Sequence, residues 1–383
     1  MILKTNQKKQ NQESQEFIWS KYLEQKMKRK KEVEKDTKKR GFNLEKDLII
    51  FSLIIFLLIL IFILYLMIVA AKNNSGKILT CGDGTLYDSC SLRKPYYCSD
   101  GLLVEKASLC ECQDILKRNG DLCTSEYQTN PKSISLKYIL RGEENEIDFT
   151  VYKGMSDYLL NTSRIITYTG NKTPSRADFK LRNINEPNQG EFLLPLVTEI
   201  QNIAKDKNDQ VRIAVSIVQN MPFGGSNKTT KFLSTEINYS RYPYEVLYDE
   251  EGVCGEKSEL LLFLLREMGY EIVAFYYLLE NHEAVGIKCP DKYGVKDSGY
   301  CFIETTGPAI ISDSEIEYGV WGKLISEPEI MVISEGFSLG ENLYEYDDAE
   351  DWIGLREKGV NTFSRNKFDE LKEKYGLGGY YDI

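Results

Sequence analysis

The sequence predicts an α+β fold in which an apolar helix packs across an antiparallel sheet. The first observation is the stretch 254–268, where apolar residues crowd several faces of a predicted helix, as expected of a buried one. The second is a trio of apolar and aromatic segments, 271–279, 282–289 and 299–306, which turns separate and which predict a meander of three strands. The third is a cysteine-rich stretch and an uncharged stretch nearer the N-terminus, which add a small disulfide-rich module and one transmembrane helix.

The N-terminal part of the chain predicts a membrane anchor. Residues 1–47 are polar and basic, and we expect a solvated helix or a disordered cytoplasmic tail there. Residues 48–71 are about 24 residues without a charge, and a helix needs about 20 to span a bilayer. This stretch is too long and too far from Met1 for an ordinary signal peptide. Because the basic flank precedes it, we expect a single-pass protein of the cell membrane whose residues from Lys72 on are extracytoplasmic.

The charge of the chain is unevenly distributed. Residues 1–47 contain 14 Lys/Arg and 8 Asp/Glu, a surplus of 6, so the chain total of −10 leaves −16 for residues 48–383. Phosphate binding requires clustered Lys/Arg. The acidic larger part of the chain therefore argues against nucleic acid as a partner.

Cysteines and glycosylation sequons agree with this topology. All nine cysteines follow the predicted span, and so does every N-x-S/T sequon. Disulfides and N-linked glycans both belong to extracytoplasmic compartments. The candidate glycosylation sites are Asn73, Asn161, Asn171, Asn227 and Asn238.

Residues 78–127 form a cysteine-rich extracytoplasmic module. An even count of cysteines there predicts three disulfides, which staple a core too small to hold itself. Fifteen connectivities are possible and the spacing does not choose among them. A zinc site is the alternative, but it lacks a C-x2-C pair and a nearby histidine, so we expect no metal and no cofactor. The six cysteines are Cys81, Cys90, Cys98, Cys110, Cys112 and Cys123.

The remaining elements are expected to form one domain over residues 131–340, with a β/α extension before a core at 191–340. A C-terminal acidic and helical tail follows at 341–383. The elements expected outside the meander are strands at 135–140, 146–152 and 329–335, helices at 155–164, 191–206 and 210–223, and an exposed helix at 364–375.

Cys254 is the cysteine best suited to chemistry. Cys289 and Cys301 flank a turn-rich loop and can close a hairpin by a disulfide, which leaves Cys254 as the odd one out. It stands at the start of the buried helix, where free N–H groups and the helix dipole favour a thiolate. A lone cysteine is more often a small buried hydrophobe, so its role depends on its neighbours.

His282 and Glu304 are the neighbours that the meander can supply. His282 is the only histidine of the chain and opens the second strand, while Glu304 ends the third. A nucleophilic thiol needs a base within reach, and the base needs a third group that orients it. The predicted helix–strand–strand order therefore suggests a Cys254–His282–Glu304 triad.

These segments resemble the transglutaminase-like superfamily, relatives of papain-type thiol proteases. The likeness is strongest to membrane-anchored, largely archaeal members, which read Y-P-x-E-T-L, G-x-C-x-D/E-x-S/A, H-x-x-V-G-V and I-E-T-T. It runs from about residue 210 to 306 and does not cover the cysteine-rich module or the anchor. The matching segments here are Tyr242–Leu247, Gly252–Ser258, His282–Ile287 and Ile303–Thr306.

The resemblance implies acyl transfer through a Cys254 thioester on a protein or peptide substrate. The enzyme would be a cysteine protease, an amidase or a transamidase acting on surface protein or wall peptide. Gln219 and Tyr242 are candidate donors to the oxyanion, beside the Cys254 N–H. The chain departs from the G-D-C-E-D form at Val253, Gly255 and Glu256, and carries Glu304 where animal enzymes have aspartate.

The alternative is a catalytically inactive ectodomain that acts as a binding or adhesion scaffold. Four acidic residues surround Cys254 in the sequence, and a negative field opposes a thiolate. These residues are Asp249, Glu250, Glu251 and Glu256.

Overall fold

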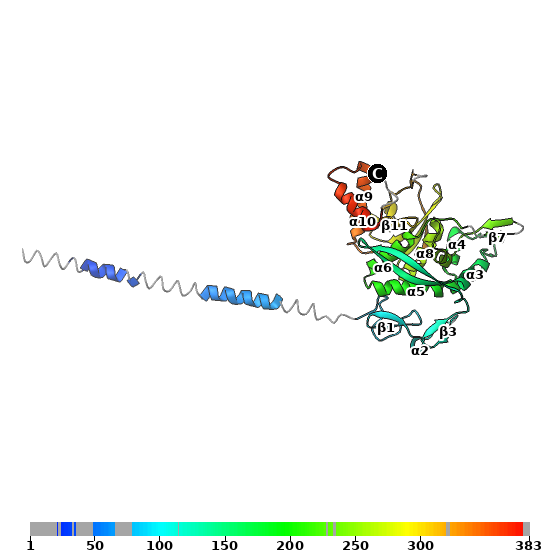
Figure 1. The fold of residues 1–383 in the computed structure, drawn as a ribbon. Coiled ribbons are helices and arrows are strands. Elements are labelled where there is room, and N and C mark those ends of the chain that lie inside the picture. Colours follow the sequence, from blue (N-terminus) through cyan, green and yellow to red (C-terminus); the bar gives the residue numbers. More distant parts are fainter. Residues whose placement is uncertain are drawn as a thin grey trace, which may run out of the picture. The chain divides into compact units, whose positions relative to one another are not determined.

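A computed structural model describes residues 21, 24–32, 34–35, 49–65, 79–113, 115–226, 229–232, 235–318 and 322–377. The chain divides into two compact units, residues 1–78 and 79–383 (Figure 1). Of the predicted span, residues 49–65 are helical and exposed, and the others lie outside the described residues. Within the described part of the chain, none of the helices combines the length and the hydropathy that a bilayer crossing requires. The single-pass topology stays a prediction.

The centre of the second unit is a mixed α+β core built on a four-stranded antiparallel sheet of order β11-β10-β9-β14. Its strands are β9 (Ile272–Tyr277), β10 (His282–Lys288), β11 (Tyr300–Ile303) and β14 (Glu329–Ser334). The predicted meander is therefore present, and the fourth strand pairs with β9 at the far side. Every residue of β9 is buried, because apolar side chains cover both faces of the sheet.

Helix α8 (Cys254–Glu267) packs on one face of this sheet. Residues 260–265 are all buried, so the helix is apolar on every side rather than along one stripe. Four further helices surround it (Figure 1), which explains that pattern. They are α4 (Arg176–Ile184), α5 (Pro187–Ile203), α6 (Lys207–Asn220) and α7 (Pro243–Asp249).

A long hairpin, β5 (Pro131–Leu140) with β6 (Glu143–Tyr152), packs on α6 and continues into α3 (Lys153–Asn161). Its alternate residues point into the core, as the period of two predicts. The short elements are β7 (Thr229–Phe232), β8 (Thr235–Asn238), η1 (Asp291–Tyr293), η2 (Val295–Asp297), β12 (Glu317–Tyr318) and β13 (Gly322–Lys323).

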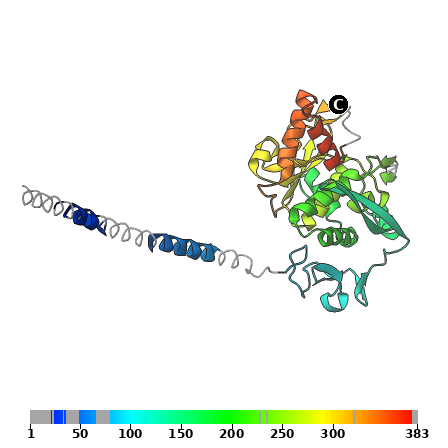
Figure 2. The same ribbon diagram turned by 60° about the vertical axis from the view of Figure 1, so that its left-hand side comes forward.

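The disulfide-rich module lies against α5, on the side of the unit away from α9 (Figures 1 and 2). Arg93 donates to the Gln201 side chain at 2.8 Å and to the Glu267 carbonyl at 2.6 Å, so the module is fixed to the core. Its bonds are Cys81–Cys98, Cys90–Cys110 and Cys112–Cys123. Its elements are β1 (Tyr96–Ser99), β2 (Leu102–Glu105), α2 (Ala107–Cys110), β3 (Lys117–Asn119) and β4 (Leu122–Thr124).

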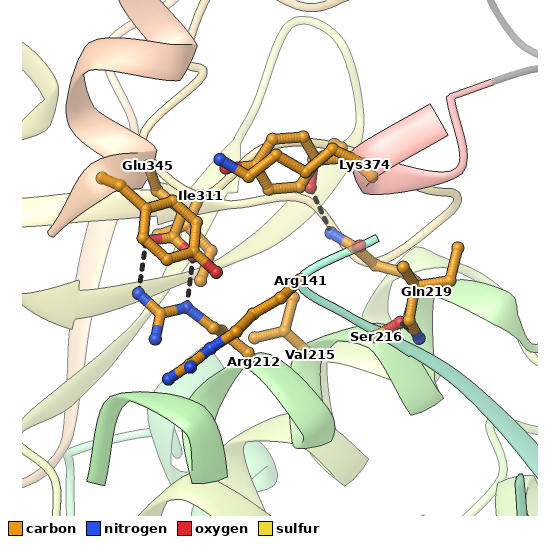
Figure 3. A pocket seen from close by; sticks show the side chains of 12 residues that line it. Arg141, Arg212, Val215, Ser216, Gln219, Ile311, Glu345 and Lys374 are labelled. Carbon is orange, nitrogen blue, oxygen red and sulfur yellow. Dashed lines mark hydrogen bonds and ion pairs between the residues drawn. The ribbon is translucent and has the colours of Figure 1, made fainter. Parts of the chain in front are cut away.

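The C-terminal segment is a packed part of the unit. Helices α9 (Tyr344–Lys358) and α10 (Arg365–Tyr375) pair with each other, so the helix expected at 364–375 is present, but one of its faces is buried rather than exposed. Phe368 is buried and stacks on the buried Trp352 at 5.1 Å between ring centroids. Figure 3 shows how α9 is held to α6: Arg212 binds both oxygens of Glu345, at 2.5 and 2.8 Å.

Candidate functional site

Cys254 is the first residue of α8 and the cysteine that no disulfide engages. The fourth disulfide joins Cys289 at the end of β10 to Cys301 in β11, the pairing that the sequence suggested. The thiol is half-buried and lies where the first N–H groups of the helix have no carbonyl partner. It therefore combines partial access with the positive end of a helix.

His282 connects this sulfur to Glu304. Its Nε2 lies 2.9 Å from Glu304 Oε2, and the Cys254 side chain is near enough to the ring to help raise the pKa of His282. Burial by itself lowers the pKa of His282, but the charge of Glu304 and the hydrogen bonds with Cys254 and Glu304 outweigh it and raise the pKa to about 10. The imidazole is thus held as a cation near neutral pH, between a carboxylate and the sulfur.

The Glu304 carboxylate is held by hydrogen bonds from the two residues that follow it. Its Oε1 accepts from the Thr305 N–H at 2.8 Å, the Thr306 N–H at 2.7 Å and the Thr306 hydroxyl at 2.7 Å. Donors to a carboxylate stabilise its charged form. The I-E-T-T sequence therefore supplies both the acid and the donors that orient it.

Thr305 ties the end of β11 to the first turn of α8. Its hydroxyl donates to the Cys254 carbonyl at 3.4 Å and contacts the Ser258 hydroxyl at 3.1 Å. The residue that directly follows the acid thus braces the segment that carries the nucleophile.

Lys257 provides a second brace, which the sequence analysis did not identify. It is fully buried, and its Nζ donates to the carbonyls of Met221 at 2.6 Å, Thr306 at 3.2 Å and Gln219 at 3.5 Å. Burial lowers its pKa to about 8, and Glu304 opposes that shift. This lysine joins α8, the C-terminal end of α6 and the segment that carries the acid.

The acidic residues near Cys254 are largely compensated by Arg241, another residue that the sequence analysis missed. This buried guanidinium binds Asp249 at 2.9 Å, Glu251 at 2.5 Å and Glu256 at 3.0 Å. Glu256 also accepts the Val253 N–H at 3.1 Å and so caps α8. Lys132 binds Glu250. A cluster of acids beside a buried helix start is itself a signal that a cation must lie among them.

On the opposite face of α8, Lys180 forms a buried ion-pair cluster. Its Nζ lies 2.8 Å from Glu259 and 2.5 Å from Glu283, and donates to the Gly255 carbonyl at 3.4 Å. A Cβ on Gly255 would lie 2.5 Å from Glu283 Oε2. A side chain at position 255 would therefore require Glu283 to move.

The two candidate oxyanion donors direct their side-chain donors to backbone carbonyls. Gln219 (labelled in Figure 3) directs its amide nitrogen to the carbonyls of Glu304 at 2.9 Å and Ala309 at 3.1 Å, so it positions the acid's segment. Tyr242 donates its hydroxyl to the Ser163 carbonyl at 3.3 Å. It lines a cavity of about 840 Å³ that none of the three triad residues lines.

The predicted glycosylation sites are partly outside the described residues, which include neither Asn73 nor Asn227. Asn161 and Asn171 are exposed, and Asn238 ends β8. Glycosylation of these residues stays a prediction.

Comparisons with known proteins do not assign the chain to a family. No protein-family model matches the chain, and no curated protein matches it. Among solved structures, calcium-bound LapG from Legionella pneumophila is similar over 45% of this chain and 98% of its own, with 13% identity and a TM-score of 0.24. This distant likeness is too weak to carry an argument, so the site is interpreted from its own geometry.

Proposed function

We propose that this chain is a thiol enzyme that transfers acyl groups through a Cys254 thioester, as a cysteine peptidase, amidase or transamidase. The observation that carries the proposal is the His282 ring, which bridges the unpaired sulfur and the Glu304 carboxylate. The resemblance of the four sequence segments to transglutaminase-like proteins supports the same chemistry.

The geometry suggests a sequence of two steps. The Cys254 sulfur attacks the carbonyl carbon of an amide, and the N–H groups at the start of α8 stabilise the oxyanion. The His282 cation gives its proton to the leaving amine, which departs and leaves a thioester. The neutral imidazole then takes a proton from water or an acceptor amine, whose attack releases an acid or a new amide and restores the thiolate.

The environment of the site is consistent with an extracytoplasmic enzyme. Four disulfides indicate an oxidising compartment. We propose a protein or peptide as substrate, and membrane attachment through residues 48–71 would hold the enzyme near cell-surface or wall substrates. The acids that favoured an inactive scaffold are paired with Arg241 and Lys132, which removes the main argument for that alternative.

The direct test is thiol labelling of the purified chain. Iodoacetamide should modify Cys254 at neutral pH, and Cys254→Ser should abolish this labelling, as measured by peptide mass spectrometry. His282→Ala should slow labelling and any amide turnover by about 10²-fold or more. Labelling and turnover that are indifferent to His282 would favour the scaffold.

The pH dependence gives a sharper test. Because the pKa of His282 is raised to about 10, the proton for the leaving amine should be retained through neutral pH, and turnover should fall as pH rises through about 10. Glu304→Gln removes the charge that contributes most to raising this pKa, so the alkaline limb should move toward the ordinary value of 6.5. An alkaline limb that stays in place in Glu304→Gln would contradict the assigned role of Glu304.

A further inference from the structure

A cavity of about 560 Å³ lies beside the first turn of α8. Two of its lining residues connect it to the site: Glu283 directly follows His282, and Lys180 donates to the carbonyl of Gly255, which directly follows Cys254. None of the three triad residues lines the cavity, so a peptide held in it would have to extend past Gly255 to reach Cys254.

The charged groups that line the cavity are predominantly cationic. They are Arg164, Arg176, Lys180 and Arg182 against Glu259 and Glu283. Lys180 lies between the two carboxylates and pairs with both, so its single charge balances one of them, and Glu283 Oε2 is buried without a hydrogen-bond partner among the described residues. The charge of Arg164 is balanced by Glu245, whose carboxylate oxygen lies 2.7 Å from the guanidinium.

Arg176 and Arg182 are the two cations of the cavity whose guanidinium groups still have hydrogen-bond donors for a ligand. Arg176 reaches Glu283 and Glu329 only at 3.8 Å, and 41% of its side chain is exposed. Arg182 directs two nitrogens to one acceptor, Asn183 Oδ1, and makes no ion pair within the described part of the chain. The third nitrogen, Nη1, is buried without a hydrogen-bond partner among the described residues. Buried donors in folded proteins are nearly always satisfied, so this N–H would gain a partner from an anion in the cavity once a small movement of the Arg182 side chain exposes it.

Aromatic rings hold both guanidinium groups in place. The Cζ of Arg176 lies 3.5 Å from the ring centroid of Tyr276, and that of Arg182 lies 5.5 Å from the ring centroid of Phe179. Stacking fixes the orientation of a guanidinium without neutralising it. The cations are therefore preorganised for a planar, bidentate anion such as a carboxylate.

We propose that this cavity binds the carboxylate of a glutamate or aspartate side chain in the peptide on which Cys254 acts, through Arg182 and Arg176. The inference rests on the proposed function, since it names the substrate class of the same site. It predicts that the enzyme selects acidic peptides although the chain itself is acidic overall.

The test uses protection of Cys254 from iodoacetamide in the purified full chain, so it does not require turnover. The probes are alanine–glycine hexapeptides with one glutamate stepped through the six positions, and matched glutamine peptides. At the best position the glutamate peptide should halve the labelling rate at a concentration at least fivefold lower than its glutamine partner. Arg182→Gln and Arg176→Gln should each reduce this preference by at least threefold.

Controls separate this proposal from the proposed function. Arg118→Gln removes an exposed charge from β3 of the disulfide-rich module and should keep the full preference. Arg176→Gln changes a partly exposed side chain, so it keeps the test decisive if Arg182→Gln fails to fold. Equal protection by glutamate and glutamine peptides, with labelling still dependent on His282, would overturn the cavity proposal alone. Labelling independent of His282 would overturn the proposed function, whereas a glutamate preference in that case would leave the cavity as an anion site.

Discussion

Two buried lysines lie on opposite faces of α8, and they differ in what neutralises them. Lys180 touches the face that carries Gly255 and Glu259, and two carboxylates surround it. Lys257 lies two residues on from Gly255, about 200° around the helix, and three backbone carbonyls accept its hydrogen bonds. Within the described part of the chain, no carboxylate forms an ion pair with Lys257.

The two environments have opposite effects on the proton. Burial disfavours both ammonium groups, but Glu259 and Glu283 more than offset it and raise the pKa of Lys180 above its ordinary value. At Lys257 the effect of burial exceeds the opposing effect of Glu304 and lowers the pKa to about 8. Carbonyl dipoles thus satisfy the hydrogen bonds of a buried cation without matching its charge. One side of the site carries a fixed charge, while the other can lose its charge at mildly alkaline pH.

The largest expected effect is on the Lys180 side. Lys180→Met leaves Glu259 and Glu283 buried without their cation, and removing one partner of a buried ion pair costs about 3–5 kcal/mol. We expect the free energy of unfolding, measured by chemical denaturation at pH 7, to fall by that amount. Lys257→Met is the matched control, because it removes a buried lysine but leaves only carbonyl groups unsatisfied. It should cost about 1–3 kcal/mol, and an equal cost for both variants would contradict the assigned difference in how the two lysines are neutralised.

Residues of the triad could be predicted from the sequence because the signal is local. One histidine, one unpaired cysteine and an acid stand in separate segments, each with its own turn or helix start. The bracing groups could not be predicted in the same way. Lys180 meets Glu283 from a helix that is 103 positions away in the chain, and Lys257 meets carbonyls, which carry no sequence signature.

Other features that the sequence analysis missed could have been predicted from residues close by in the chain. The acids near Cys254 required a cation, and Arg241 lies only 8 residues before the first of them. Phe368 and Leu371 are spaced three apart on a predicted helix, which indicates one buried face, and both are buried against α9. Gln219 and Tyr242 were chosen by resemblance alone, and their hydrogen bonds are made elsewhere.

The free energy of unfolding should also depend on pH through Lys257. The pKa of Lys257 is about 8 in the folded chain and 10.5 in the unfolded chain, so the unfolded state binds more protons between these values and the free energy of unfolding rises with pH there. A difference of 2.5 pKa units corresponds to roughly 3 kcal/mol. We expect the stability of the wild type relative to Lys257→Met to increase by that order between pH 8 and 10.5.

Subtracting the free energy of unfolding of Lys257→Met from that of the wild type cancels the opposing pH dependence that His282 contributes to both. Its pKa is raised from 6.5 to about 10 in the folded chain, so its stabilisation is complete below pH 6.5 and is lost as pH rises through 10. Both proteins contain this group. A flat difference between pH 8 and 10.5 would mean that Lys257 keeps its proton like Lys180.

The smallest expected effect tests how tightly the Lys180 cluster is packed. Gly255→Ala places a methyl group 2.5 Å from Glu283 Oε2 and 3.2 Å from Lys180 Nζ, so the carboxylate must move and the ion pair must lengthen. Overpacking of this kind costs about 1–2 kcal/mol.

Gly190→Ala is the matched control in α5, where nothing lies within 4 Å of the added methyl, and alanine should add about 0.5–1 kcal/mol of stability there. If the cost at Gly255 arises from the displaced carboxylate, it should shrink in a Lys180→Met background, where Glu283 has lost its close ion pair and keeps only Arg176 at 3.8 Å. A cost that is unchanged in that background would place the strain in the backbone of α8 rather than in the ion pair.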